Sequence, residues 1–186
     1  METMIAGLIL WSVVHLFPAI SPGLRQSLVG KMGENGYKGG VALLVVLSVV
    51  LIVFGWRHTS PDFVYLLPPA FKHISMLLIV LAFILMGAAQ YPTRIKRIIR
   101  HPQLTGLLIW AIAHLMLNGD SRSILLFGWL AVWAVLEIIF INRRDGAWIK
   151  PEAPAWSREA RGLAISIVVI VIVVFIHPYI AGVPIT

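Results

Sequence analysis

Residues 106–118, GLLIWAIAHLMLN, place His114 in the middle of an apolar run. The first ten of these residues are similar to residues 7–16, GLILWSVVHL, because glycine, leucine, tryptophan and histidine fall at the same offsets. An ionisable residue inside a membrane segment indicates a functional site by default, since hydrocarbon offers it no water. The stretch therefore predicts a membrane-spanning fold with a site inside it.

Each histidine follows a tryptophan by four residues, so Trp11 and His15, like Trp110 and His114, share one helix face. Two interpretations of the similarity stay open: an internal repeat, which is often weak in sequence, or a coincidence of apolar composition. A lone membrane histidine can also hydrogen-bond a neighbouring helix, a contact worth about 0.6 kcal/mol on average. For the pair of histidines, we favour a ligand-binding role.

Composition places the chain among multi-pass α-helical membrane proteins. Its 186 residues are 59% hydrophobic and 12% charged, with a mean hydropathy of +0.90. The apolar runs are long and continuous, unlike the alternating ten-residue segments of a β-barrel. The chain has no cysteine, which excludes disulfides, iron–sulfur clusters and thiolate-ligated haem.

The predicted fold class is an all-α integral membrane protein with about six transmembrane helices. A short interfacial helix is also expected in the first loop, within residues 21–38, because leucine and methionine recur there every four residues and Gly33 can end it. The predicted spans are residues 4–20, 39–56, 73–90, 104–118, 123–141 and 162–180.

Basic residues divide unevenly between the loops. The first, third and fifth loops hold 12 of the 15 Lys and Arg residues, and the other three are Arg57, Lys72 and Arg122. The positive-inside rule then predicts an inner-membrane protein with Met1 and Thr186 both outside the cytoplasm. Three spans per half would give a 3+3 inverted repeat. The basic loops on the cytoplasmic side thus account for the net charge of +7, and no nucleic-acid partner is expected.

Two imidazoles brought together across a helical bundle suit a bis-histidine haem b. A catalytic zinc would require a third protein ligand, and covalent haem would require Cys-x-x-Cys-His. His15 and His114 are therefore the predicted iron ligands, with Trp11 and Trp110 forming an apolar pocket around them. Their depths differ by some six residues, or about 9 Å at the helical rise, so a shared haem would have to be tilted.

His101 precedes Pro102 at the start of the fourth predicted span. It is expected either to mark the helix start or to meet a haem propionate together with Arg100 or Arg97. Both interpretations stay open.

The remaining ionisable groups of the apolar runs have simpler expected roles. Glu137 is expected to form a salt bridge with Arg143 or Arg144 near the inner edge of the fifth span. His58, His73 and His177 lie near span ends and are expected to be interfacial.

Several motifs together resemble those of the NnrU family, which are bacterial membrane proteins named for a link to nitrite and nitric oxide metabolism. The plant 15-cis-zeta-carotene isomerase belongs to the same group. The matching motifs are His15-Leu16-x-Pro18, Leu24-Arg25, Gly36-Tyr37-Lys38-Gly39, Arg100-His101-Pro102, Ala113-His114-Leu115, Asn118-Gly119-Asp120, Leu126-Phe127-Gly128 and Arg143-Arg144. The resemblance implies a single domain over residues 1–186, strongest over residues 1–144.

The resemblance also implies a b-type haem held by two histidines, which by motif position are His15 and His114. Asn118, in the Asn-Gly-Asp block, is also expected to contact the cofactor. The isomerase has a suggested alternative ligand, a cysteine shortly before the second histidine. This chain has Trp110, Ala111 and Ile112 there, so the same ligand switch is not expected.

Three functions follow as hypotheses. The first is a haem-dependent cis–trans isomerase of a polyene or carotenoid-like lipid. The second is a nitric oxide-linked accessory or electron-transfer protein of denitrification, and the third is a small inverted-repeat transporter without haem. The expected partners are the lipid bilayer and an apolar small molecule or nitric oxide, and a homo-oligomer is left open.

Overall fold

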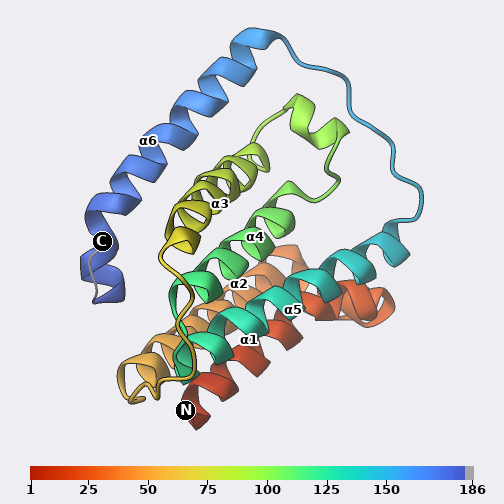
Figure 1. Cartoon of the computed structure of the whole chain (residues 1–186). Helices are drawn as coiled ribbons and strands as arrows, with labels where there is room; N and C mark the ends of the chain where they lie inside the picture. The colour runs from red at the N-terminus through yellow and green to blue at the C-terminus, as the bar shows by residue number, and fades with distance from the viewer. Residues whose placement is uncertain (183–186) are drawn as a thin grey trace.

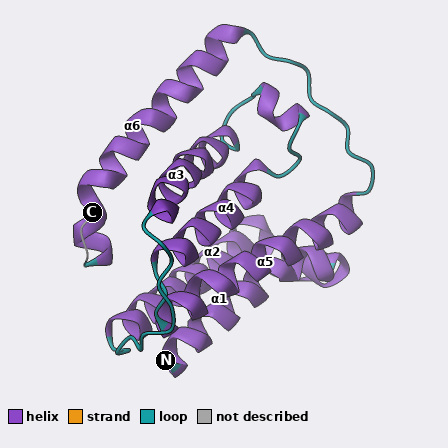
Figure 2. Ribbon diagram, viewed as in Figure 1, coloured by secondary structure: helices purple, strands orange, loops and turns teal. Residues whose placement is uncertain are grey.

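The computed structural model describes residues 1–182, in which six α-helices and one short 3-10 helix make up the regular structure (Figures 1 and 2). The elements are α1 (Glu2–Ile20), α2 (Pro22–Arg57), α3 (Ala70–Ala88), η1 (Arg94–Arg97), α4 (Pro102–Leu117), α5 (Ser121–Asp145) and α6 (Trp156–Ala181). Five of the described helices are long and apolar enough to cross a membrane, and α4 is shorter at 16 residues. The prediction of an all-α membrane protein is confirmed.

Helix ends follow local signals more than hydropathy. Proline opens α2 and α4, where its missing N–H costs nothing. Asp120 caps α5 by accepting a hydrogen bond from the Ser123 amide at 3.0 Å. Helices α5 and α6 extend beyond the predicted spans, since hydropathy marks only the part of a helix that contacts hydrocarbon.

The predicted interfacial helix and second span meet without a loop. The helix α2 is broken at Gly33, whose φ of 72° and ψ of 161° are available essentially to glycine alone. Gly33 was correctly predicted to end the first segment. The predicted first loop, residues 21–38, is therefore helical on both sides of Gly33, because the helix resumes at once after the glycine.

Packing orders the helices as α2, α1, α5, α4, α3 and α6, each contacting the next. Helix α6 packs mainly on α3 and stands at the edge of the bundle (Figure 1). A 3+3 repeat would pair α1 with α4 and α3 with α6, and would require α6 to pack on α1 as α3 packs on α4. Among residues 1–182 the main helix contacts do not include that pair. The α1–α2 contact does have a counterpart in the α4–α5 contact, so the packing repeats only in part.

Two ends of the bundle can be distinguished. At one end, the Met1 ammonium donates to Thr59 Oγ1 at 2.7 Å, and the amide of Val64 donates to the Gly119 carbonyl at 2.8 Å. At the other end, Arg100 donates to the Gly146 carbonyl at 2.8 Å. The loops rich in basic residues thus lie together at the second end. Thr186 lies outside the described residues.

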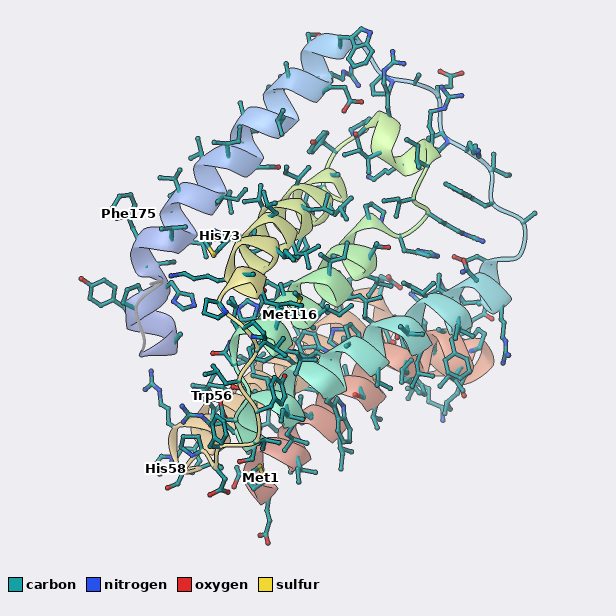
Figure 3. All side chains as sticks on the ribbon, in the orientation of Figure 1. Met1, Trp56, His58, His73, Met116 and Phe175 are labelled. Atoms are coloured by element: carbon teal, nitrogen blue, oxygen red, sulfur yellow. The ribbon has the colours of Figure 1, made fainter. Side chains whose placement is uncertain are left out.

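Many large apolar side chains are exposed, among them Phe175 on the outer helix α6 (Figure 3). Leu43, Leu77 and Phe175 are 69%, 72% and 74% exposed, as expected where the solvent is lipid rather than water. Small residues bring α1 and α2 into close contact: a Cβ added to Gly55 would lie 2.4 Å from the Met4 nitrogen. Such close backbone approach is a main source of helix association in membranes.

Candidate functional site

The two Trp–His pairs have matching local geometry. His15 Nδ1 lies 2.8 Å from the Trp11 carbonyl, and His114 Nδ1 lies 2.9 Å from the Trp110 carbonyl. The paired ring centroids are 4.1 Å and 4.3 Å apart, which confirms that each pair shares a helix face. Because a carbonyl only accepts, each Nδ1 carries the proton and each Nε2 keeps its lone pair. This is the tautomer that metal-binding histidines use.

His15 lies between two tryptophans at the contact of α1 with α5. The Trp133 ring meets His15 edge-on, with centroids 5.3 Å apart and an interplanar angle of 74°. Trp133 also meets Trp11 edge-on at 5.5 Å. One interhelical hydrogen bond fixes this contact, since Trp129 Nε1 donates to Ser12 Oγ at 2.9 Å.

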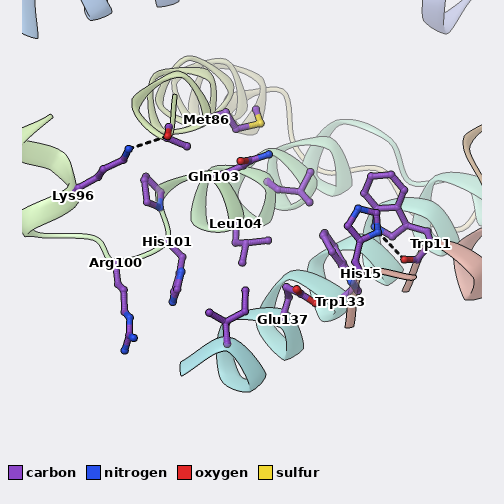
Figure 4. A pocket seen from close by; sticks show the side chains of 14 residues that line it. Trp11, His15, Met86, Lys96, Arg100, His101, Gln103, Leu104, Trp133 and Glu137 are labelled. Atoms are coloured by element: carbon purple, nitrogen blue, oxygen red, sulfur yellow. Dashed lines mark hydrogen bonds between the residues drawn. The ribbon is translucent and has the colours of Figure 1, made fainter. Parts of the chain in front are cut away.

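His15 opens into a cavity of about 540 Å³, which we call the His15 cavity (Figure 4). Helices α1, α3, α4 and α5 and the loop before α4 form its walls. The lining residues are Trp11, His15, Met86, Ala89, Lys96, Arg100, His101, Pro102, Gln103, Leu104, Leu107, Trp133, Glu137 and Ile141. Figure 4 shows the histidine and tryptophans on one side and the basic side chains on the other.

Three basic side chains form the mouth of the cavity. Lys96 Nζ donates to the Ala89 carbonyl at 2.9 Å, and Arg100 donates to the Gly146 carbonyl. His101 Nε2 donates to Asn142 Oδ1 at 2.9 Å. Among residues 1–182 none of the three has a carboxylate partner within 4.0 Å, so their N–H groups form no salt bridge that a bound anion would have to break.

His101 is the residue before the first turn of α4, and Pro102 occupies that turn. Both sequence interpretations of His101 are therefore compatible with its position, since it marks the helix start and also lines the cavity beside Arg100. Arg97 lines a different cavity.

Three buried polar atoms of lining residues have no hydrogen-bond partner within the described chain: Trp11 Nε1, Trp133 Nε1 and Glu137 Oε2. Glu137 is only 8% exposed. A buried polar group left unpaired costs about 1–3 kcal/mol, and native proteins contain few. Two donors and a carboxyl oxygen are thus available to whatever fills this space.

The expected salt bridge of Glu137 is wrong. Arg144 instead pairs with the adjacent Asp145, with Nε 2.7 Å from Oδ1. No cation lies within 4.0 Å of Glu137 in the described chain. The side chain points into the His15 cavity because it follows Trp133 by four residues and shares its helix face.

His114 does not line the His15 cavity. Its ring lies 4.6 Å from that of Phe127, and Phe127 also contacts Trp110 at 5.1 Å. The nearby His177 of α6 interacts with it electrostatically. Asn118 Nδ2 donates to the His114 carbonyl at 3.0 Å and is likewise absent from the cavity wall.

The two histidines also differ in depth. His15 precedes the end of α1 by five residues, and His114 follows the start of α4 by twelve. Measured from the same end of the bundle, these positions correspond to about 8 Å and about 18 Å at 1.5 Å per residue. The structure therefore does not bring the two imidazoles to one cavity.

The other histidines occupy the positions expected of interfacial groups. His58, at the end of α2, is exposed, and its Nδ1 lies 2.8 Å from the Phe54 carbonyl. His73 is exposed in the first turns of α3. His177 lies near the end of α6.

Sequence reasoning missed most of the lining side chains, among them Met86, Lys96, Trp133 and Glu137. One signal was available for two of them, because Trp133 and Glu137 repeat the four-residue spacing of Trp11 and His15. Met86 and Lys96 reach the cavity only through tertiary packing.

No group of three or more His, Cys, Asp or Glu residues suited to a bare metal ion occurs among residues 1–182. A haem iron needs only one or two protein ligands, since the porphyrin supplies four nitrogens. The donors present, one imidazole with an apolar surround, therefore fit a haem better than a hydrolytic metal.

A family model described as NnrU protein matches residues 3–185. The match continues beyond Arg144, so the similarity is not confined to the residues where the motifs were found. Neither the curated proteins nor the solved structures yield a match.

Proposed function

We propose that this chain, which belongs to the NnrU family, is a membrane protein that binds haem b in the His15 cavity. The observation that carries the proposal is the composition of that cavity's wall. An imidazole with an available Nε2 lies at one side of the space, and three basic side chains lie at the other.

Size and charge both support this proposal. Cofactor pockets usually enclose about 300–1,000 Å³ and are mostly apolar with a few fixed polar groups, and this cavity of about 540 Å³ lies within that range. Haem is an apolar macrocycle with two carboxylates at one edge. Lys96, Arg100 and His101 would bind the carboxylates through charge-assisted hydrogen bonds.

Each lining residue has a defined part in this proposal. His15 would bind the iron through Nε2, and the Trp11 carbonyl would hold the ring in that tautomer. Trp11 and Trp133 would exclude water from the apolar side. When bound, the haem would supply an iron centre that accepts a small ligand or an electron.

That His114 is a second ligand of the haem iron stays a prediction. To serve the same iron, it would have to leave its contacts with Trp110 and Phe127 and enter the cavity. The geometry therefore supports His15 as the residue of this cavity that would bind the iron.

Two finer activities are proposed. Family resemblance favours a haem-dependent cis–trans isomerase of a polyene. The unpaired indole N–H groups of Trp11 and Trp133 instead favour a small ligand with acceptor atoms, such as nitric oxide, and hence a role linked to denitrification. Adding each compound to the reduced protein and recording its visible spectrum would separate these activities.

The loop charges support an inner-membrane location with the basic end of the bundle in the cytoplasm. Reporter fusions at Met1 and Thr186 should then both report the non-cytoplasmic side. A cytoplasmic signal at either end would contradict this orientation.

The haem proposal is tested by purifying the protein in detergent from haem-replete cells. We expect the oxidised and dithionite-reduced spectra of b-type haem, and acidified acetone should extract all of the pigment because nothing attaches it covalently. A colourless preparation would contradict the proposal and leave the transporter hypothesis.

A further inference from the structure

A second cavity, of about 270 Å³, lies at the basic end of the bundle and is lined by Arg94, Arg97, Ile98 and Lys150. It shares no lining residue with the His15 cavity. The 3-10 helix η1 supplies two of its arginines, and the segment that joins α5 to α6 supplies the lysine. Three cations from two separate segments therefore meet at one small space, and no carboxylate lines it.

These cations form no salt bridge within the described chain. None of the three cations lies within 4.0 Å of a carboxylate oxygen among residues 1–182. The nearby Glu159 accepts hydrogen bonds from the Arg94 amide and from Thr93 Oγ1, and its single negative charge leaves the three cations in excess. In addition, Arg94 Nε is buried without a partner.

Aromatic contacts hold two of the cations in place. The Arg94 guanidinium stacks over Trp156 at 4.3 Å, and it donates to the Pro154 carbonyl at 3.2 Å. Lys150 Nζ lies 5.3 Å from the Trp148 ring. Because these side chains are ordered by the protein itself, a bound anion would not have to order them.

The surroundings of the cavity fit the membrane–water interface. Tryptophan is enriched at this level of a bilayer, and two tryptophans lie beside the cations. Ile98 and Ile149 are 79% and 90% exposed, although they adjoin charged residues. An apolar surface next to a cavity with a net positive charge matches a ligand with an anionic head and apolar tails.

We propose that this cavity binds the phosphate head group of an anionic phospholipid. Basic pockets on the cytoplasmic side of membrane helices recognise such head groups, and arginine suits phosphate because its N–H groups bind two oxygens at once. The bound lipid would add a further link between η1 and the segment before α6, which already meet through Arg94, Pro154 and Trp156. The proposal does not depend on haem binding.

Native mass spectrometry in a non-ionic detergent tests the proposal. Wild-type protein is titrated with phosphatidylglycerol and, separately, with phosphatidylcholine of the same acyl chains. We expect selective retention of phosphatidylglycerol. The double variant Arg97→Gln/Lys150→Gln should bind it more weakly by on the order of tenfold, since each basic residue near an anionic surface contributes several-fold.

A matched control removes the same charge elsewhere at that end of the bundle. The variant Lys31→Gln/Arg161→Gln changes two exposed residues without an ion pair in the described chain, and it should bind phosphatidylglycerol like wild type. Equal binding of both lipids, wild-type affinity in the double variant, or an equal loss in the control would each overturn the proposal.

A competition experiment distinguishes binding of a lipid from binding of a soluble phosphate. Glycerol 3-phosphate has the same charged group without acyl chains, and we expect it to compete at least a hundredfold more weakly than phosphatidylglycerol. Equal competition would overturn the assignment to lipid. The visible spectrum of the double variant should match wild type, so failure here and failure of the haem proposal are distinguishable.

Discussion

His15 on α1 and His114 on α4 share a local arrangement but differ in what lies opposite them. In both, the ring packs on a tryptophan four residues earlier and Nδ1 donates to that residue's carbonyl. Helix α5 faces both histidines. It presents Trp133 and a cavity to the first, and the tilted ring of Phe127, with centroids 4.6 Å apart, to the second.

The difference shows which part of a site a short motif determines. The four-residue spacing sets the tautomer and the ring orientation, because both depend on one turn of helix. Access to a ligand depends on the neighbouring helix, which the motif does not contain. Two similar stretches can therefore give one imidazole that lines a cavity and one that packs against a phenylalanine instead.

The largest difference is expected when each of the two α5 aromatic residues that contact the histidines is replaced by alanine. Trp133→Ala should lower haem affinity about 100-fold, because apolar contact with a large buried side chain contributes up to about 3 kcal/mol and its loss would open the His15 side of the cavity to water. Phe127→Ala removes a ring of comparable burial beside His114 and should keep haem affinity within about threefold. Haem titration of the apoprotein measures both. Equal losses would mean that the two histidines serve one site.

A smaller effect is expected at the cavity mouth. Arg100→Gln should lower haem affinity about tenfold, since a hydrogen bond to a charged group contributes about 1.5–3 kcal/mol. Lys72→Gln is the matched control, because Lys72 is exposed at the start of α3 and does not line the cavity. An unchanged affinity in Arg100→Gln would mean that the anionic edge of the cofactor does not face this mouth.

The smallest effect is expected for Glu137, which has no counterpart near His114. Glu137→Gln keeps the size of the side chain and one acceptor oxygen, so haem affinity should change by no more than about threefold. Quantifying haem that survives gel filtration is sufficient here. Complete loss of haem would show that the carboxyl group holds the cofactor directly, which this account does not expect.

The sequence predicted the helices well, because long apolar runs and proline or glycine at their ends are local signals. Gly33 was identified as a break for the same reason. The four-residue spacing puts Trp133 and Glu137 on one face of α5, but the sequence could not predict that this face lines the His15 cavity, because that depends on how α5 is rotated against α1. The predicted salt bridge of Glu137 was wrong because the Arg144 guanidinium pairs with the adjacent Asp145 carboxylate instead. The depth difference between His15 and His114 was visible in the span positions, and the structure retains it.

The most direct test compares the visible spectra of His15→Ala and His114→Ala, each with and without added imidazole. This account predicts that His15→Ala loses most of its haem and that imidazole partly restores it by occupying the vacated position. His114→Ala should retain haem, as should His58→Ala, whose ring makes the same carbonyl bond at an exposed helix end. A wild-type haem spectrum in His15→Ala, together with loss of haem in His114→Ala, would contradict the account.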